Sequence, residues 1–365
     1  MDRRKFLKTT AMLPAAAAVS GLPRFASADM GASGDWRVFE VTTEARVLEP
    51  AGVTRVWLPV PLARDTDYQK NLGNIWTAQG GTVVYTADNK YHAGIVSAEF
   101  QQPATPTTLR LTSRFATRDR KVDFSKPAGE KEAPAVLKLN LEPTALIPTD
   151  GIVRDTAMKI VKGQNNNIDK ARAIYEWMVD NTFRDAKVRG CGWGDIKSML
   201  ETGNLGGKCG DLSALFVGLA RASGVPARDM YGVRVASSRN CFKSLGAASE
   251  VISKAQHCRA EFYAEGYGWI PVDPADVRKV VLEEPPGNLA LNDEKVRKAR
   301  KMLFGYWEMN WVAFNDAHDV RLPGSQGPAI PYLMYPNGET AQGRLDSLDP
   351  DTFKYTMTAR ELTDA

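Results

Sequence analysis

Motifs that would bind a metal or a cofactor are scarce in this sequence. Its 365 residues include three histidines and four cysteines, with neither a CxxC nor an HExxH motif, so we expect no dedicated metal site. The segment 203–209, GNLGGKC, has three residues between its outer glycines where a phosphate-binding loop has four. It also places Cys209 where that loop needs Ser or Thr to hold magnesium. We therefore predict no nucleotide and no cofactor.

A long apolar run is also lacking. The apolar stretch near the N-terminus is interrupted at Pro14 and Gly21, which makes it too short to span a bilayer. A pair of arginines at 3–4 precedes this stretch, and the small-residue sequence ASA at 26–28 follows it. This pattern predicts a twin-arginine signal peptide over residues 1–28, a periplasmic location and no stable insertion in the membrane.

The chain has no large net charge when the predicted signal peptide is left out of the count. The whole chain has a formal net charge of +4, and the first 28 residues carry five basic side chains against the single acid Asp2. The remaining chain is therefore close to neutral. A neutral chain gives no reason to expect nucleic acid or an acidic membrane as a partner, and the sequence makes no prediction about the number of subunits.

The hydrophobic content of 43% is sufficient for a full core. Five segments rich in β-branched and aromatic residues come first, at 38–47, 54–62, 82–86, 91–100 and 107–118. Helical periodicity becomes clear only after Pro148. We therefore predict an α+β protein with a β-sandwich-like N-terminal domain. The expected division is a signal peptide (1–28), a β-rich domain (29–121), a linker (122–148), a core (149–325) and a C-terminal extension (326–365).

The second half of the chain alternates helices and strands. Residues 167–181 have one apolar side and a cap at Asn167, and residues 293–302 form a charged helix. The expected strands lie at 231–236, 256–263, 267–272, 306–314 and 354–358.

A helix that begins near Cys209 is the main feature of the second half. Apolar residues recur at helical spacing from Leu212 to Leu219, and Gly224 and Pro226 are stop signals. Cys209 would then lie at the positive end of a buried helix, where free backbone N–H groups favour a thiolate. The alternative is that Cys209 is a small buried hydrophobic residue, as most free cysteines are.

The segment 256–276 predicts a β-hairpin that carries a histidine and a carboxylate. A turn centred on Glu265 would set Glu261 opposite Trp269 and His257 opposite Asp273. The opposite, apolar face would carry Cys258, which we expect in the core.

A histidine oriented by a carboxylate forms half of a nucleophilic triad, and Cys209 would supply the nucleophile. The alternative is a surface His257–Asp273 pair with an unrelated cysteine. Asp276, just beyond the hairpin, is expected to be dispensable. His318 is a competing base that ranks lower, because no carboxylate partner is evident for it.

Three blocks of this sequence resemble the transglutaminase-like superfamily. They are GKCGD at 207–211 with RASGVPAR at 221–228, HCRAEFY at 257–263, and GWIPVDP at 268–274. The resemblance covers about residues 149–280. It implies a papain-like fold with the catalytic order Cys209, His257 and Asp273, and a protein or peptide substrate that passes through an acyl-thioester.

The oxyanion donor is where the sequence departs from this family. Phe183 stands near the place where the family often has a polar aromatic residue or glutamine, and it cannot donate a hydrogen bond. Trp193 or Trp177 could substitute through the indole N–H, and Trp193 and Trp269 could line the substrate approach.

Three functions remain open at this point. We expect a cysteine hydrolase that cleaves peptide or carboxamide bonds, because no acidic cluster marks a site for an amine acceptor. The alternatives are a protein-glutamine transamidase and a catalytically silent scaffold. A disulfide between Cys191 and Cys241 is compatible with an exported protein.

Overall fold

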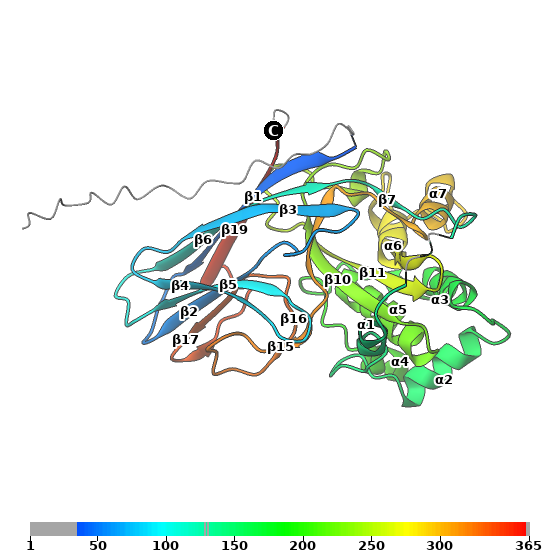
Figure 1. Cartoon of the computed structure of the whole chain (residues 1–365), viewed down its shortest axis with the longest axis horizontal. Helices are drawn as coiled ribbons and strands as arrows, with labels where there is room; N and C mark the ends of the chain where they lie inside the picture. Colours follow the sequence, from blue (N-terminus) through cyan, green and yellow to red (C-terminus); the bar gives the residue numbers. More distant parts are fainter. Residues whose placement is uncertain (1–34, 128, 130, 363–365) are drawn as a thin grey trace, which may run out of the picture.

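The structure, a computed structural model, describes residues 35–127, 129 and 131–362. The predicted signal peptide lies outside these residues. A β-rich half stands beside a half that carries the helices (Figure 1). This arrangement confirms the predicted α+β class.

Two antiparallel sheets enclose the core of the β-rich half. One has the order β19-β1-β6-β3 and the other β18-β17-β2-β5-β4. The strands of the first are β19 (Phe353–Leu362), β1 (Arg37–Val47), β6 (Thr107–Thr117) and β3 (Gln69–Thr77). Those of the second are β18 (Gly343–Arg344), β17 (Asn337–Thr340), β2 (Thr54–Pro59), β5 (Gly94–Phe100) and β4 (Thr82–Ala87). Residues from both sheets, such as Leu58 and Leu109, are fully buried in one shared apolar cluster.

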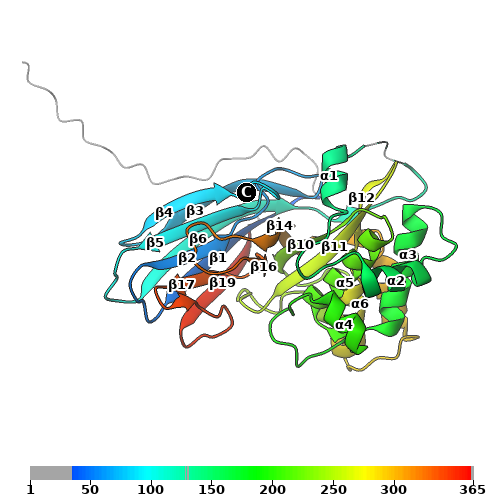
Figure 2. The same ribbon diagram turned by 90° about the horizontal axis from the view of Figure 1, so that it is seen from below.

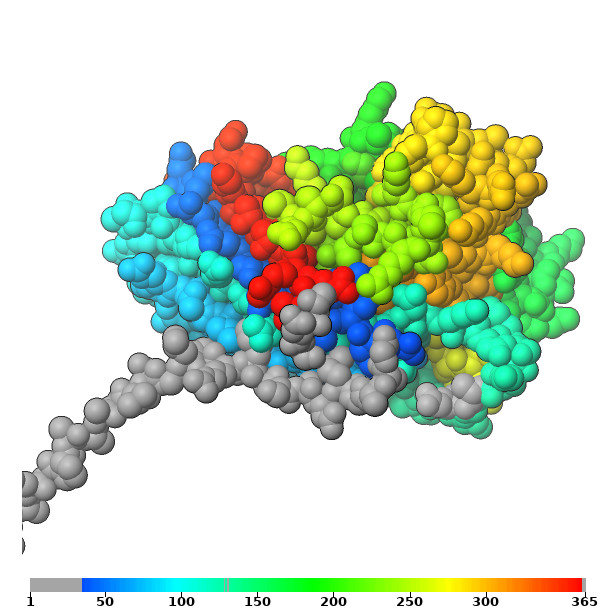
Figure 3. All heavy atoms as spheres, turned by 90° about the horizontal axis from the view of Figure 1, so that it is seen from above, coloured from blue at the N-terminus to red at the C-terminus, as the bar shows by residue number. Residues whose placement is uncertain are grey.

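The described part of the segment 326–365 completes both sheets, although the sequence suggested an extension. β19 pairs along β1, with Thr43 opposite Met357, and β17 pairs with β2. Figure 3 shows this C-terminal strand in red, between the blue first strand and the yellow-green loops of the helical half. On that side, the amide of Ile252 donates to the carbonyl of Met357 at 2.8 Å. The C-terminal strand therefore joins the two halves.

The helical half is built on the sheet β12-β11-β10-β14, with helices gathered beside it (Figure 2). Its strands are β12 (Gly268–Val272), β11 (Gln256–Ala264), β10 (Ala227–Arg234) and β14 (Trp311–Asn315). Its helices are α1 (Pro134–Leu139), α2 (Gly151–Ile160), α3 (Asn167–Asn181), α4 (Ile196–Thr202), α5 (Cys209–Ala222), α6 (Pro274–Glu283) and α7 (Glu294–Met302). Short pairs are β7 (Arg120–Lys121) with β13 (Tyr306–Trp307), β8 (Phe183–Arg184) with β9 (Gly206–Gly207), and β15 (His318–Val320) with β16 (Ile330–Tyr332).

Helix α5 is buried on all sides, from Cys209 through Arg221. Such a helix belongs to the interior of a domain rather than to its surface. Helix α3 packs against it and has the predicted bounds, although the side chain that caps it is Asn166, which accepts from the amide of Asp169, and not Asn167. Within the described part of the chain, no helix combines the length and apolarity needed to cross a membrane.

Candidate active site

Cys209 is the first residue of α5, and its side chain is 4% exposed. Asp211, in the first turn, accepts hydrogen bonds from the amides of Lys208 and Gly194, each at 3.0 Å. These contacts leave the amide of Cys209 without a hydrogen-bond partner among the described residues. The first turn therefore presents a thiol and a free N–H at the positive end of a helix dipole.

The loop before α4 brings a second thiol to Cys209. The amide of Gly210 donates to the carbonyl of Cys191 at 2.8 Å. Gly192 has φ near 90°, and a Cβ there would overlap the Asp211 carboxylate, so the loop depends on glycine. The disulfide considered between Cys191 and Cys241 is absent: both are free, with Cys191 buried beside Cys209 and Cys241 exposed.

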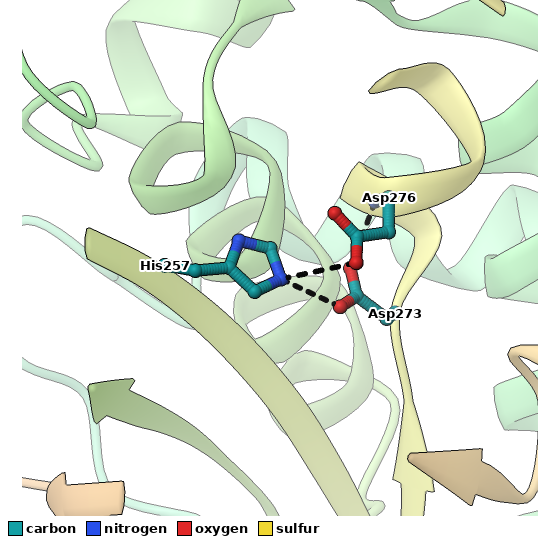
Figure 4. Close-up of side chains that lie close together, drawn as sticks. All are labelled: His257, Asp273 and Asp276. Atoms are coloured by element: carbon teal, nitrogen blue, oxygen red, sulfur yellow. Dashed lines mark hydrogen bonds and ion pairs between the residues drawn. The ribbon is translucent and has the colours of Figure 1, made fainter. Parts of the chain in front are cut away.

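His257, on β11, meets Asp273 at the start of α6. Nε2 of His257 lies 2.8 Å from Oδ2 of Asp273, and Nδ1 points away from the carboxylates (Figure 4). The indole of Trp311 donates to the carbonyl of His257 at 3.0 Å and fixes the strand at this point. His257 and Cys209 line the same cavity, and the charge of His257 lowers the pKa of the Cys209 thiol. The structure thus brings together all three residues of the predicted triad.

The hairpin that carries His257 has a different register from the predicted one. Glu261 lies opposite Pro271 and Tyr263 opposite Trp269, a shift of two residues, because the turn is centred on Gly266 and not on Glu265. A two-residue shift keeps every side chain on its expected face, so Cys258 is buried in the core as predicted. Asp273 reaches His257 as the N-cap of α6, where Oδ1 accepts from the amide of Asp276 at 2.8 Å.

Asp276 is part of the site, contrary to the expectation that it is dispensable. Its Oδ2 lies 3.4 Å from Nε2 of His257. Nη2 of Arg234 donates to both of its carboxylate oxygens, at 2.6 and 2.8 Å. A second guanidinium, Arg259, lies 3.6 Å from Asp273 and stacks over the ring of Trp311. Two buried carboxylates are therefore balanced by two buried arginines and one histidine.

These charges set the protonation of His257 and Cys209. Burial, the largest influence, and Arg234 both favour neutral imidazole, but Asp276 and Asp273 outweigh them and raise the pKa of His257 to about 9. Hydrogen bonds with neighbouring thiols, first Cys191, and the charge of His257 hold the pKa of Cys209 well below its usual range, against burial. The site therefore favours a thiolate and an imidazolium.

His257, Asp273 and Asp276 offer three ligand atoms within 4.8 Å of one another. The arrangement does not fit a cation well, because Arg234 already occupies both oxygens of Asp276. Asp273 is likewise engaged by His257 and the α6 amide. A metal ion would have to displace a buried guanidinium from its carboxylate, at a considerable cost in free energy.

A cavity of about 740 Å³ opens onto Cys209 and His257. One wall comes from the loop 246–256, which precedes His257, and another from residues 335–355 of the C-terminal segment. Gln256 and Tyr335 are polar, uncharged members of these walls. The cavity therefore lies where the β-rich half meets the helical half.

None of the three tryptophans considered for this site lies on the cavity wall. Trp193 is 71% exposed and borders a different, very small pocket. Trp177 packs against the main core from α3. The indole of Trp269 donates to Glu132 at 2.8 Å. Phe183 is 44% exposed and also lies outside the cavity.

His318 has a carboxylate partner, which the sequence did not suggest. Its Nε2 lies 3.3 Å from Asp229, and both residues are buried. It borders the small pocket beside Trp193 and not the cavity with Cys209. His318 therefore does not line the cavity that contains the nucleophile.

Sequence reasoning missed Asp276, Arg234 and the C-terminal wall. A signal for Asp276 was present, because Asp273-Pro274-Ala275-Asp276 has an N-cap residue, proline at the first helical position and an acid three residues after the cap. No comparable local signal marks Arg234 or Tyr335, which reach the site through tertiary packing.

Comparison with known proteins agrees with this geometry. Residues 154–274 match the family model of the transglutaminase-like superfamily core. A protein of Haemophilus influenzae, described as uncharacterised, is 35% identical over 349 residues, which cover 90% of this chain and 92% of that one. The crystal structure of a candidate cysteine protease from Cytophaga hutchinsonii has a similar fold. Its TM-score is 0.53 at 16% identity, over 89% of this chain and 98% of that one.

Proposed function

Because the chain belongs to the transglutaminase-like superfamily, we propose that it is a cysteine hydrolase of peptide or carboxamide bonds. The observation that carries this proposal is the position of Cys209, at the N-terminus of α5 and in the same cavity as a histidine that is itself bonded to Asp273 at 2.8 Å. This is the geometry of a nucleophile, a base and an orienting carboxylate.

In the proposed mechanism, the Cys209 thiolate attacks the carbonyl carbon of the substrate. The amide N–H of Cys209 holds the developing oxyanion, and the Tyr335 hydroxyl on the cavity wall is a further donor. The side-chain amide of Gln256, on the same wall, already donates to Tyr355 and Met357. The imidazolium of His257 protonates the departing amine, which leaves an acyl-thioester on the sulfur. His257, now neutral, takes a proton from water, and the resulting hydroxide releases the acid and restores the thiolate.

The charge of the cavity favours water over an amine as the acceptor. Its lining includes seven basic side chains and, among the residues that the structure describes, no acidic one. A primary amine is a cation at neutral pH, so this wall would repel it. We therefore place the transamidase second and the silent scaffold third.

Isotope labelling tests the proposed reaction. A tryptic digest of casein is incubated with the enzyme in H₂¹⁸O containing 10 mM methylamine, with Cys209→Ala as the control. Hydrolysis predicts new carboxyl groups that carry ¹⁸O. If most products are methylamides, the protein is a transamidase and not a hydrolase. If neither kind of product forms, the scaffold function is favoured.

The leader motif supports a periplasmic location as part of this proposal. Fusion of residues 1–28 to a reporter that is active only when exported tests it, with the Arg3 and Arg4 codons changed to lysine as the control. Retention of the unaltered fusion in the cytoplasm would contradict the proposed export.

A further inference from the structure

The cavity that leads to Cys209 is strongly basic, although the chain without its leader is close to neutral. Its seven basic side chains lie among 24 lining residues. They come from four separate parts of the chain: the segment 184–208, strand β10, the segment from 254 to α6, and β19. They are Arg184, Arg189, Lys208, Arg234, Lys254, Lys279 and Lys354. The positive charge is therefore concentrated at the candidate site.

Four of these seven cations are paired with acids that lie outside the cavity lining. Arg184 and Lys279 share Glu283, Arg189 pairs with Asp346, and Arg234 pairs with Asp276. Three carboxylates thus face seven lysine and arginine side chains, which leaves four positive charges in excess, while the His257 imidazolium and the Cys209 thiolate cancel each other.

Three lysines account for most of this excess. Lys208, Lys254 and Lys354 form no ion pair with any residue in the described part of the chain. Lys208 directly precedes Cys209 at the helix N-terminus, Lys254 lies three residues before His257, and Lys354 is the second residue of β19, on the C-terminal wall. Unpaired cations on several sides of one cavity create a field that concentrates anions there.

We propose that the site selects acidic peptides, whose carboxylates flank the bond that Cys209 attacks. This inference rests on the proposed hydrolase and names its substrate class. The carboxylates would pair with Lys208, Lys254 and Lys354 from at least two walls of the cavity. An acidic side chain and a free C-terminus supply the same group, and matched peptides distinguish them.

Alkylation of Cys209 measures this selection without any turnover. Iodoacetate and iodoacetamide each lose iodide to a thiolate, but only iodoacetate is an anion. The rate ratio of iodoacetate to iodoacetamide at Cys209 is measured by peptide mass spectrometry and divided by the same ratio for N-acetylcysteine. The ratio also removes any effect of Lys208 on the thiolate itself.

We expect this normalised ratio to be about 10 at 20 mM salt and to approach one at 0.5 M salt, because dissolved ions screen the electrostatic field of the cavity. Lys208→Gln, Lys254→Gln and Lys354→Gln should each lower this ratio about twofold, and the triple variant, which keeps one of the four excess charges, should bring it close to one. Lys162→Gln, an exposed lysine that lies outside the cavity, is the matched control and should leave it unchanged. A ratio near one in the unaltered protein would overturn the inference.

Peptides provide the second arm. Each peptide that the enzyme cleaves in a casein digest is resynthesised with Glu→Gln exchanges, and again with an amidated C-terminus. With the unaltered enzyme, the inference predicts a loss of about tenfold in kcat/KM for the exchanged peptides. With the triple lysine variant, the original and the exchanged peptides should be cleaved equally. Equal cleavage of acidic and neutral peptides overturns the inference and leaves the hydrolase intact. A high alkylation ratio without cleavage of any peptide overturns the hydrolase and leaves the anion site.

Discussion

Oδ2 of Asp276 lies 3.4 Å from Nε2 of His257, and the same carboxylate accepts two hydrogen bonds from one nitrogen of Arg234. His257 therefore faces two carboxylates, of which Asp273 is the nearer at 2.8 Å. The pair of acids explains why the pKa of a fully buried histidine is raised instead of lowered.

Asp273→Asn is expected to lower kcat by a factor of about 10²–10⁴ with the fold intact. An amide cannot hold the imidazolium as a carboxylate does, and it favours the wrong tautomer. Asparagine is as good an N-cap as aspartate, so α6 should persist. The matched control is Asp293→Asn, the N-cap of α7, whose kcat should equal that of the unaltered enzyme. A similar loss in both variants would mean that helix capping, and not His257, explains the effect.

Asp276→Asn is expected to destabilise the fold by about 3–5 kcal/mol, because it leaves the buried Arg234 guanidinium without its counter-charge. Urea denaturation measures this free energy. Glu201→Gln, which removes the exposed pair with Lys197, should change it by less than about 1 kcal/mol. If the two variants are equally stable, the buried pair has no structural importance.

Helix α3 has the bounds that its periodicity predicted, whereas β3 was not predicted at all. The difference follows from the residues, because the polar residues and glycine from Lys70 to Asn74 leave only the last three residues of β3 with β-branched or aromatic side chains. Its strand form depends on pairing with β6, including a register shift between Asn71 and Gly73. Long-range pairing decides such a segment, because its local strand pattern is too short to predict it.

The candidate site shows the same division. Cys209, His257 and Asp273 could be found because each lies in a local motif. The hairpin turn is centred on Gly266 instead of the predicted Glu265, and this difference leaves each side chain of the hairpin on its predicted face. Lys354 reaches the cavity because β19 pairs with β1, more than 300 residues away in sequence, and Tyr335 comes from the segment just before β17. Arg234, on β10, is held there by its hydrogen bonds to Asp276 of α6.

Activity should be highest between two titrations. On the acid side it falls when Cys209, whose pKa lies well below its usual range, becomes protonated. On the alkaline side it falls near pH 9, as His257 loses the proton needed by the leaving amine. Asp276→Asn should move the alkaline limb of kcat/KM to lower pH, since that carboxylate raises the pKa of His257. If the alkaline decrease of kcat/KM stays at the same pH in this variant, a group other than His257 causes it.

The same histidine makes stability depend on pH. The pKa of His257 is raised from 6.5 to about 9 in the folded protein, so its contribution to folding is complete below pH 6.5 and is lost as the pH rises through 9. The free energy of unfolding of the unaltered protein should therefore fall across this range more steeply than that of His257→Gln. Parallel curves for the two proteins would contradict the raised pKa.

Among the four thiols, Cys209 should react first with limiting iodoacetamide at pH 7. Burial raises the pKa of Cys258, a hydrogen bond with Cys209 raises that of Cys191, and Cys241 has only its exposure to favour it. His257→Gln should slow labelling of Cys209, whereas His318→Gln, away from the cavity, should not. Faster labelling of Cys241 or Cys191 in the folded protein would contradict a thiolate at Cys209.

The most direct test of the account is the mass of Cys209 during turnover. The enzyme is mixed with a casein digest, quenched in acid within milliseconds to seconds, and analysed by peptide mass spectrometry. We predict an acyl group on Cys209 that neutral hydroxylamine removes, as it does a thioester, and that is absent in Cys209→Ala. Cleavage of peptides without this adduct, or with the adduct on another residue, would contradict Cys209 as the nucleophile.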